Sequence, residues 1–385
     1  MVRSGVQGNS FDVIVLGCGG FGSSAAWHLG QRGVRVLGID QFSPPHDQGS
    51  SHGETRVIRK AYFEHPDYVP LLHRAYDLWL QLEQESQQSL FNRCGLLLAG
   101  PASGEVIAGA RESARLYQLP IENLSQTDCR GRFPLIRVPD DLDIVFEADA
   151  GYLHAERCVE AHLKLARSAG VQFAFNEKVC EVHLATDSVR VVTSKHEYHA
   201  ASLVVTGGAW CVQLLPEYSQ LIRVRRKTLF WLPISDARWN DERQSTIHLM
   251  ELPGGTFYGF PSVDRNTVKV AEHSGGELSD NADNINRLIS EDDSIGVLNY
   301  VSNCLSGVTP SVARASVCMY SMSPDGHFLI DRLPDAPVVI AAGFSGHGFK
   351  FTSVIGQALA DLTLHHSTPL PIQFLSRKRC HGPFW

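Results

Sequence analysis

The sequence predicts an α/β protein, α+β overall, in which a Rossmann-like nucleotide-binding domain carries an inserted second domain built on an antiparallel sheet. A chain of 385 residues exceeds what one ordinary hydrophobic core organises, so two domains are expected. Residues 11–40 run strand, glycine-rich turn, helix, strand, which is the βαβ unit of a parallel sheet. Residues 245–275 alternate apolar and polar side chains between turn signals, a pattern typical of an antiparallel sheet.

The other elements follow from the spacing of apolar residues along the chain. The first unit holds a buried strand at Phe11–Leu16, a helix with small residues after the glycines, and a second strand at Val34–Asp40. Further on, apolar spacing predicts, in chain order, a helix at 69–87, a helix at 156–169, strands within 171–185, a strand and glycine turn at 201–210, a strand at 338–343 and a helix at 351–366.

Pieces typical of a nucleotide-binding domain therefore recur at the start, in the middle and near the end of the chain. Such recurrence indicates that the second domain is inserted between them. The predicted nucleotide-binding domain consists of residues 1–90, 150–222 and 322–385. The predicted inserted domain consists of residues 91–149 and 223–321.

Composition limits the classes of function. Net charge is -7 and the isoelectric point about 6.2, which argues against a nucleic-acid partner. The first ten residues are polar and the apolar run Val13–Leu16 is too short to span a bilayer, so we expect a cytoplasmic protein without a membrane partner. The carboxyl end, "CHGPFW", is not a peroxisomal address. Nine cysteines lack paired metal-ligand spacing, and no metal site is expected.

A glycine motif in the first unit predicts a dinucleotide site. Gly17, Gly19 and Gly22 form G-x-G-x-x-G between a strand and a helix. In that context the first glycine permits the turn, the second lets the backbone approach a pyrophosphate, and the third lets helix and strand pack closely. Asp40 closes the second strand and can accept hydrogen bonds from ribose hydroxyls. A glycine-rich turn in an unrelated α/β domain would look similar, and the motif alone does not separate FAD from NAD.

Five later segments carry a resemblance that favours FAD. They are "QFSPPHDQGSSHGETRVIRKAY" at 41–62, "YGFP" at 258–261, "VKVAEH" at 268–273, "CMYSMSPDGHFLID" at 318–331 and "VVIAAGFSGHGFKF" at 338–351. In these segments the chain resembles the sarcosine oxidase and N-methyltryptophan oxidase family of FAD-dependent amine oxidases. The resemblance runs nearly end to end. It implies an FAD domain made of discontinuous segments and a substrate domain on an antiparallel sheet.

The resemblance also implies how the cofactor is held. Cys318 matches the cysteine that is bonded to the flavin 8α-methyl group, so covalent FAD is expected. Nearby cations should lower the pKa of such a thiol, because the thiolate is the nucleophile. A cysteine without this context is more often buried and inert. The other positions matched to cofactor binding, besides the glycine motif and Asp40, are Ser50, Val179, Gly343, Gly346 and Gly348.

Two cations match the residues that hold the substrate carboxylate in this family, Arg59 and Lys350. An arginine offers a two-pronged fork and a lysine a point charge, which suits an α-carboxylate. Taken alone, each would more often be a solvated surface charge. Lys350 follows the glycine-rich turn after a strand, where the edge of a flavin could lie.

The remaining matched residues surround the reacting groups. The resemblance assigns Tyr258, His273 and Tyr320 to the amine pocket, and Lys269 to the activation of O₂, where a fixed cation stabilises developing negative charge. It places His52 and Arg56 against the flavin. An aromatic residue or a histidine on a strand is otherwise usually structural.

The implied reaction is the oxidation of a secondary amino acid by FAD, followed by transfer of two electrons to O₂ to give hydrogen peroxide. For sarcosine the products are glycine and formaldehyde, and a monomeric enzyme is expected. N-methyl-L-tryptophan, L-pipecolate and L-proline stay open as substrates, since the pocket loops lie in the poorly matched stretches 91–150 and 223–257. An NAD-dependent dehydrogenase fits the glycine motif but leaves the last two segments unexplained. A flavin-binding subunit without turnover is a further alternative, disfavoured by the presence of Lys269, Lys350 and Cys318 together.

Overall fold

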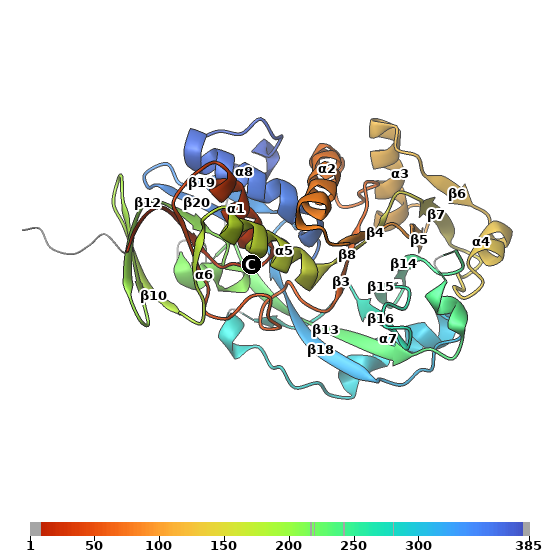
Figure 1. Ribbon diagram of the computed structural model, residues 1–385. Helices are drawn as coiled ribbons and strands as arrows, with labels where there is room; N and C mark the ends of the chain where they lie inside the picture. The colour runs from red at the N-terminus through yellow and green to blue at the C-terminus, as the bar shows by residue number, and fades with distance from the viewer. Residues whose placement is uncertain (1–8, 216–217, 219, 242, 280, 380–385) are drawn as a thin grey trace, which may run out of the picture.

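The computed structural model describes residues 9–379 apart from 216, 217, 219, 242 and 280. The terminal residues 1–8 and 380–385, on which the predictions about targeting partly rest, lie outside this range. Figure 1 shows two lobes side by side, with helices α1, α2, α5 and α8 over the left and central part and α3, α4 and α7 on the right. The α-helices are α1 Gly20–Gln31, α2 Val69–Ser86, α3 Glu105–Tyr117, α4 Gln126–Arg132, α5 Ala155–Ser168, α6 Cys211–Leu214, α7 Asp292–Cys304 and α8 Thr352–His365.

The first sheet has eight strands and contains the βαβ unit that the sequence predicts. Its parallel part has the order β9-β2-β1-β12-β20, with β10 and β11 as an antiparallel ribbon beyond β12 and β19 antiparallel to β20. The strands are β1 Ser10–Leu16, β2 Val36–Ile39, β9 Gln172–Ala174, β10 Val179–Leu184, β11 Val189–Thr193, β12 Glu197–Val205, β19 Leu329–Arg332 and β20 Val338–Ala342.

The alternation of side chains on β1 explains why this sheet is buried on both faces. Val13 and Val15 pack with residues of α1, α2, α5 and α8. Ile14 and Leu16 point the other way, into a second cluster that also holds residues of β10, β11 and α6. Each such side chain contributes roughly 1.5–3 kcal/mol when fully buried. The continuous apolar run of this strand is thus the signature of a central parallel strand.

The second sheet has nine strands in the order β17-β13-β16-β15-β14-β5-β7-β6, with β18 along β13. The antiparallel sheet expected over 245–275 is confirmed as β14, β15 and β16, although β14 also pairs in parallel with β5. The strands are β5 Leu96–Gly100, β6 Glu122–Leu124, β7 Asp143–Glu147, β13 Arg223–Pro233, β14 Ile247–Leu252, β15 Gly255–Gly259, β16 Thr267–Glu272, β17 Leu278–Ser279 and β18 Arg314–Met322.

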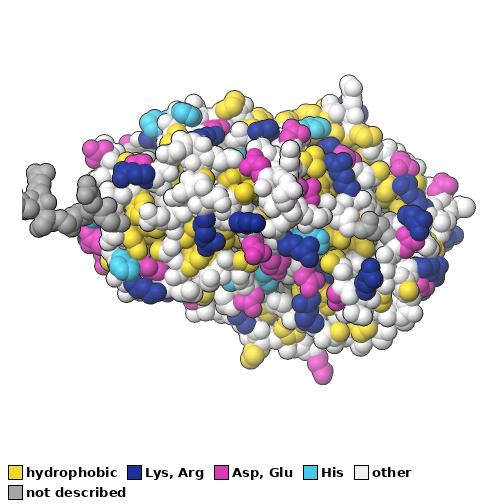
Figure 2. Space-filling model, viewed as in Figure 1, with side chains coloured by type: hydrophobic (Ala, Val, Ile, Leu, Met, Phe, Trp, Pro, Cys, Tyr) yellow, Lys and Arg dark blue, Asp and Glu magenta, His cyan; other side chains and the backbone are white. Residues whose placement is uncertain are grey.

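A small sheet of β3 Thr55–Ile58, β8 Gly151–His154 and β4 Phe91–Asn92 completes the fold. The mixed architecture confirms the predicted fold class, whereas the exact division of the chain into two domains stays a prediction. Figure 2 shows acidic and basic side chains interspersed over the visible face. Among the described residues, no helix is both long and apolar enough to cross a bilayer.

Candidate active site

A cavity of about 420 Å³ is lined by both large sheets and by the loops that follow β1, β2 and β20. The second sheet contributes residues to the cavity because side chains alternate between its two faces along each strand. On β16, Val268 and Val270 pack under α7, whereas Lys269 and Ala271 lie on the opposite face. On β18, Cys318 lies on the face that looks toward the cavity. The strand period therefore brings chemically active side chains to one surface.

The glycine motif forms one end of this cavity. Gly17 has a φ of +85°, and a Cβ there would lie 2.6 Å from the Thr206 carbonyl oxygen. A Cβ on Gly22 would lie 1.8 Å from the carbonyl oxygen of Gly17, so helix α1 and the turn touch at that point. The helix begins after Gly19, which provides no side-chain cap. The Gly20 N–H donates to the Ser51 hydroxyl at 3.1 Å, and the positive end of the helix dipole lies toward the cavity. These features fit the pyrophosphate of a dinucleotide.

The nucleotide end continues past β2 to Asp40, which is buried at the cavity wall. Its carboxylate accepts N–H groups from Cys18 at 2.8 Å and from Phe42 at 2.9 Å, and this fixes its orientation. Val179, the first residue of β10, lies in the same wall. Ser50 also lines the cavity and donates its hydroxyl to the Met319 carbonyl oxygen at 2.6 Å.

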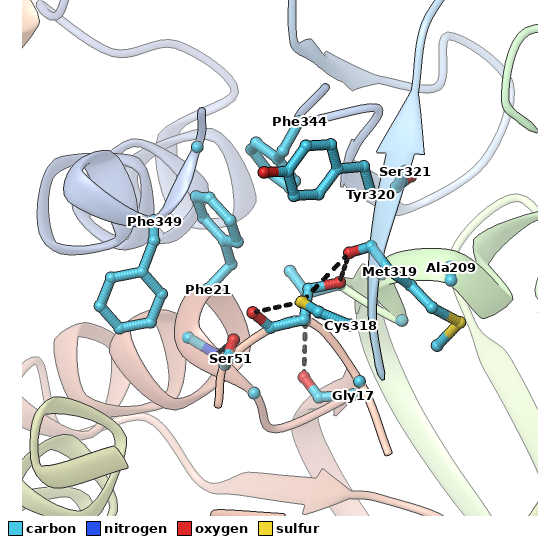
Figure 3. A pocket seen from close by; sticks show the side chains of 18 of the residues that line it. Gly17, Phe21, Ser51, Ala209, Cys318, Met319, Tyr320, Ser321, Phe344 and Phe349 are labelled. Atoms are coloured by element: carbon cyan, nitrogen blue, oxygen red, sulfur yellow. Dashed lines mark hydrogen bonds between the residues drawn. The ribbon is translucent and has the colours of Figure 1, made fainter. Parts of the chain in front are cut away.

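Cys318 lies at the middle of the cavity on β18. Figure 3 shows it on β18 beside Met319, and its Sγ lies 3.9 Å from the carbonyl oxygen of Ser50, in the loop that carries Ser51. Burial raises the pKa of this thiol, but the interaction with His52 and the charges of Arg56 and Lys269 outweigh burial and bring the pKa to about 6. The Arg56 guanidinium is 3.7 Å from Sγ. At neutral pH the sulfur is therefore largely a thiolate, the form that reacts with electrophiles.

Lys269 is buried behind the cavity wall. Its Nζ donates to the carbonyl oxygens of Gly53 and Thr55, each at 2.7 Å, and to the Thr55 hydroxyl at 3.1 Å. These three acceptors match the three N–H bonds of an ammonium group. Burial, followed by the like charge of Arg56, lowers the pKa of Lys269 well below its ordinary value.

Arg59 and Lys350 both reach the far end of the cavity, together with Glu64. The Arg59 guanidinium forms an ion pair with Glu64 at 2.6 Å and donates to the Ala61 carbonyl oxygen at 3.1 Å. Lys350 Nζ donates to the His347 carbonyl oxygen at 2.7 Å. Burial and the charge of Arg59 lower the pKa of Lys350 to about 7, despite the opposing effect of Glu64.

The pair with Glu64 is an ionised one. Burial raises the pKa of Glu64, but Arg59, His347 and Lys350 together lower it to about 2. The end of the cavity therefore holds one carboxylate of the protein beside two basic groups. The carboxylate of a bound ligand would be attracted there by the positive charge of Arg59 and Lys350 that Glu64 does not neutralise.

Three ring side chains stand between Cys318 and this charged end. The rings of Tyr258 and His273 are 6.5 Å apart, and those of His273 and Tyr320 are 5.8 Å apart. Burial lowers the pKa of His273 to about 4, so its imidazole is neutral at physiological pH. The three polar ring groups can hydrogen-bond a small ligand without adding charge to it.

The structure brings most of the predicted site residues to one cavity. Those in its wall are Gly17, Gly19, Asp40, Ser50, Arg56, Arg59, Val179, Tyr258, His273, Cys318, Tyr320, Gly346, Gly348 and Lys350. Four predicted residues lie behind the wall instead: Gly22, His52, Lys269 and Gly343. His52 and Lys269 still act on the cavity, because both lower the pKa of Cys318.

Sequence reasoning missed two acidic residues at the site. Glu64 ends the same segment, "RKAYFE", that begins with Arg59, so an acid close to a proposed ligand-binding arginine was the available signal. Glu156, at the start of α5, accepts the backbone N–H groups of Gly53 and Glu54. Nothing local in the sequence marks Glu156. Among the described residues, no group of three or more His, Cys, Asp or Glu could hold a metal ion.

Comparison with known proteins identifies the family. Residues 12–362 match the FAD-dependent oxidoreductase family. The chain belongs to this family. It is 37% identical over 376 residues to the monomeric sarcosine oxidase of Streptomyces avermitilis, covering 96% of this chain and 98% of that one. It is 36% identical over 372 residues to the N-methyl-L-tryptophan oxidase of Yersinia pestis, covering 96% and 99%. The resemblance inferred from the sequence is thereby confirmed, and the protein is an FAD-dependent oxidoreductase.

Solved structures share the fold of this FAD-dependent oxidoreductase at lower identity. NikD, described as an unusual amino acid oxidase essential for nikkomycin biosynthesis, superposes with a TM-score of 0.86 at 24% identity, covering 96% of this chain and 97% of that one. L-proline dehydrogenase from P. horikoshii gives a TM-score of 0.80 at 19% identity, covering 96% and 98%. At these identities the comparison establishes the fold alone.

Proposed function

We propose that the protein oxidises sarcosine, with O₂ and water, to glycine, formaldehyde and hydrogen peroxide. The observation that carries the proposal is that Arg59 and Lys350 lie at one end of the cavity that Cys318 also lines. A fork and a point charge suit the carboxylate of an amino acid. The names of the relatives, sarcosine oxidase and N-methyl-L-tryptophan oxidase, support an N-methylated amino acid as the substrate.

FAD, when bound, supplies the two-electron chemistry of this reaction. In the proposed complex the turn Gly17–Gly22 holds the pyrophosphate, and Asp40 holds a ribose hydroxyl. Cys318 would hold the flavin through a thioether to its 8α-methyl carbon, with a C–H bond of that methyl group replaced by the C–S bond and the two electrons released passing through the flavin to O₂. The low pKa of the Cys318 thiol supports this bond, since a thiolate is required to make it.

The remaining residues act on the amine and on oxygen. Tyr258, His273 and Tyr320 would surround the amine nitrogen, with His273 neutral because burial lowers its pKa to about 4. Lys269 would place a positive charge next to the site where O₂ gains electrons, which stabilises the negative charge that develops there. Arg56, beside Cys318, would keep the redox-active end of the cavity positive.

The cavity wall also supports an alternative substrate. Phe63, Leu249 and Phe260 give it an apolar side, which favours a bulkier secondary amino acid such as N-methyl-L-tryptophan, L-pipecolate or L-proline. The same carboxylate end would serve all of them. A flavin-binding subunit without turnover is the more distant alternative, disfavoured by the combination of Lys269, Lys350 and Cys318.

The experiment is a screen for peroxide release across sarcosine, N-methyl-L-tryptophan, L-pipecolate and L-proline, with glycine as a primary-amine control. The highest kcat/KM on sarcosine, with formaldehyde formed in equal amount, would support the proposal. Preference for a ring-bearing substrate would move it to the alternative. Yellow protein that releases no peroxide with any of these amines would contradict both.

We also propose that the enzyme works as a monomer in the cytoplasm. The name "monomeric sarcosine oxidase", borne by several relatives, supports the first part. The absence of a membrane-crossing helix among the described residues is compatible with the second. Light scattering of the purified protein, expected at 42.4 kDa, tests the oligomeric state.

A further inference from the structure

One peptide group links a carboxylate of α5 to Lys269. This peptide joins Gly53 to Glu54. Its N–H donates to Glu156 at 3.0 Å to Oε2 and 3.1 Å to Oε1, and its carbonyl oxygen accepts from Lys269 Nζ at 2.7 Å. The N–H of Gly53 donates to Glu156 Oε1 at 2.6 Å as well. Hydrogen bonds that run in series through a peptide polarise one another, so the carboxylate strengthens the carbonyl as an acceptor for the ammonium.

The loop that carries this peptide is held in an unfavourable conformation. Gly53 has a φ of +87° and Glu54 a φ of +70°, and the left-handed region is costly for a residue with a side chain. A Cβ on Gly53 would lie 2.6 Å from Leu229. Because Glu156 accepts both N–H groups of the loop, it stabilises the one conformation that turns the Gly53 carbonyl oxygen toward Lys269.

Four charged or titratable groups face Lys269: Arg56, Glu156, Cys318 and Glu54. Arg56 opposes the ammonium, and the other three favour it. Glu54 is shared with Trp231, which donates to it at 2.8 Å, and with the Arg314 guanidinium. The negative charge of Cys318 disappears if the thiol becomes a thioether. No ion pair joins Glu156 to a residue in the described ranges; its hydrogen bonds go to the loop, and its charge favours the charged forms of both Lys269 and Arg56.

We propose that Glu156 is a positioning residue that keeps Lys269 charged and in place through the Gly53–Glu54 peptide, and so controls the reaction with O₂. The inference rests on the proposed function, in which Lys269 acts on oxygen. The proposal predicts different effects on the two halves of the reaction, oxidation of the amine and reoxidation of the flavin by O₂. Removing the charge of Glu156 should affect the oxygen half and spare oxidation of the amine, because the carboxylate end at Arg59 and Lys350 is untouched.

The test uses the FAD-loaded enzyme with Glu156→Gln, which keeps the shape of the side chain and removes its charge. Burial already lowers the pKa of Lys269, and losing Glu156 should lower it further, so the ammonium is lost at a lower pH. Reoxidation by O₂ should therefore be slower in Glu156→Gln than in the wild type, and the fold-change should be larger at pH 8 than at pH 6. Anaerobic reduction by substrate should stay within about twofold.

The midpoint potential of the bound flavin gives a second readout that does not depend on turnover. If Glu156 acts through Lys269, the potential at pH 8 should fall in Glu156→Gln, because a positive charge is lost. If Glu156 were only a nearby negative charge, its removal should raise the potential at both pH values. A rise at both, or an unmoved pH profile for reoxidation, overturns the proposal.

Three controls separate the effect of position from the effect of charge. Glu160→Gln removes an exposed carboxylate from the same helix and should change neither readout. Glu156→Asp keeps the charge and should return reoxidation at pH 8 toward the wild-type rate; failure to do so would overturn the role of charge. In a Lys269→Met background, Glu156→Gln should no longer lower the potential.

The outcome also distinguishes this proposal from the proposed function. If Lys269→Met leaves reoxidation unchanged, the oxygen role of Lys269 is wrong, and the inference about Glu156 falls with it. If Lys269→Met slows reoxidation while Glu156→Gln has no effect, only the inference about Glu156 is overturned.

Discussion

Lys350 should act as a pH-dependent half of the carboxylate clamp. Its pKa is about 7 in the ligand-free protein, because burial and Arg59 disfavour the ammonium. About nine-tenths of it is charged at pH 6 and about one-tenth at pH 8. Since only the charged form holds a carboxylate, affinity for a carboxylate ligand should fall about tenfold between these pH values.

Of the other groups near this end of the cavity, His273 and Glu64 do not titrate in that window, whereas Lys227 begins to lose its charge at the upper edge of it. The pKa of His273 is lowered to about 4, mainly by burial, and that of Glu64 to about 2, where the cations outweigh burial. Burial lowers the pKa of Lys227 to about 8, and its Nζ is bonded to the carbonyl oxygens of Ser274 and Gly275. Lys227→Met is therefore the matched control, and it should retain the pH dependence that Lys350→Met loses.

The assay is titration of the flavin absorption band with methylthioacetate, an inert acid without an amine, and with its neutral amide. A charge-assisted hydrogen bond contributes roughly 1.5–3 kcal/mol, so Lys350→Met should bind the acid about ten- to a hundredfold more weakly at pH 6. Binding of the amide should change much less. Arg59→Ala should weaken the acid more at pH 6 than at pH 8, because loss of the guanidinium raises the pKa of Lys350 and leaves more of it charged at pH 8. Equal weakening of acid and amide would refute the clamp, and equal wild-type affinity at pH 6 and 8 would refute the role of Lys350 as its pH-dependent half.

Three further predictions concern other parts of the site. Cys318→Ala should fold without covalent flavin. In wild-type apoprotein mixed with FAD, the rate of flavin attachment should rise as the pH increases through about 6 and then level off, because the pKa of the thiol is about 6. Mass spectrometry of tryptic peptides measures both, and flavin on another cysteine would contradict the assignment. Lys269→Met should slow reoxidation of the reduced flavin by O₂ about 100- to 1000-fold, while anaerobic reduction of the flavin by substrate is slowed less. An unchanged reoxidation rate in stopped-flow experiments would show that the oxygen site lies elsewhere. Glu64→Gln should lower the free energy of unfolding by about 3 kcal/mol, since it leaves the buried Arg59 without its ion pair. Added methylthioacetate should reverse part of the resulting fall in melting temperature. A loss of less than about 1 kcal/mol would mean that the ion pair contributes little to stability.

The parts of the fold that the sequence predicts are those with local signals. The βαβ unit over residues 11–40 has its strands, glycines and helix in one stretch, and the structure confirms all of them. The strand pattern around Lys269 has a period of two, which correctly separates Val268 and Val270 from the cavity face. The short strands β5, β6 and β7 were not predicted, because their pairing partners lie far along the chain.

The same reasoning explains which parts of the site were missed. The roles assigned to Arg59 and Lys350 came from resemblance, and the structure places both at one end of the cavity. Glu156 was not found, since its partners Gly53 and Glu54 are backbone groups some hundred residues earlier. A side chain that acts on peptide N–H groups leaves no pattern of residue types, so only three-dimensional structure reveals it.

The residues that line the cavity come from strands that lie far apart in the sequence, and this has a consequence for synthesis of the protein. Strand β1 emerges from the ribosome early, but its parallel neighbour β12 lies about 190 residues later, and β20, which completes the parallel part of the sheet, ends at Ala342. Parallel pairing over such separations is slow, because loop closure must precede the contacts that reward it. The nascent chain therefore exposes apolar residues of β1 at least until β12 has been made. Capture of the nucleotide belongs to the last stage of folding, and a chaperone that shields the first strands would raise the yield of FAD-loaded protein.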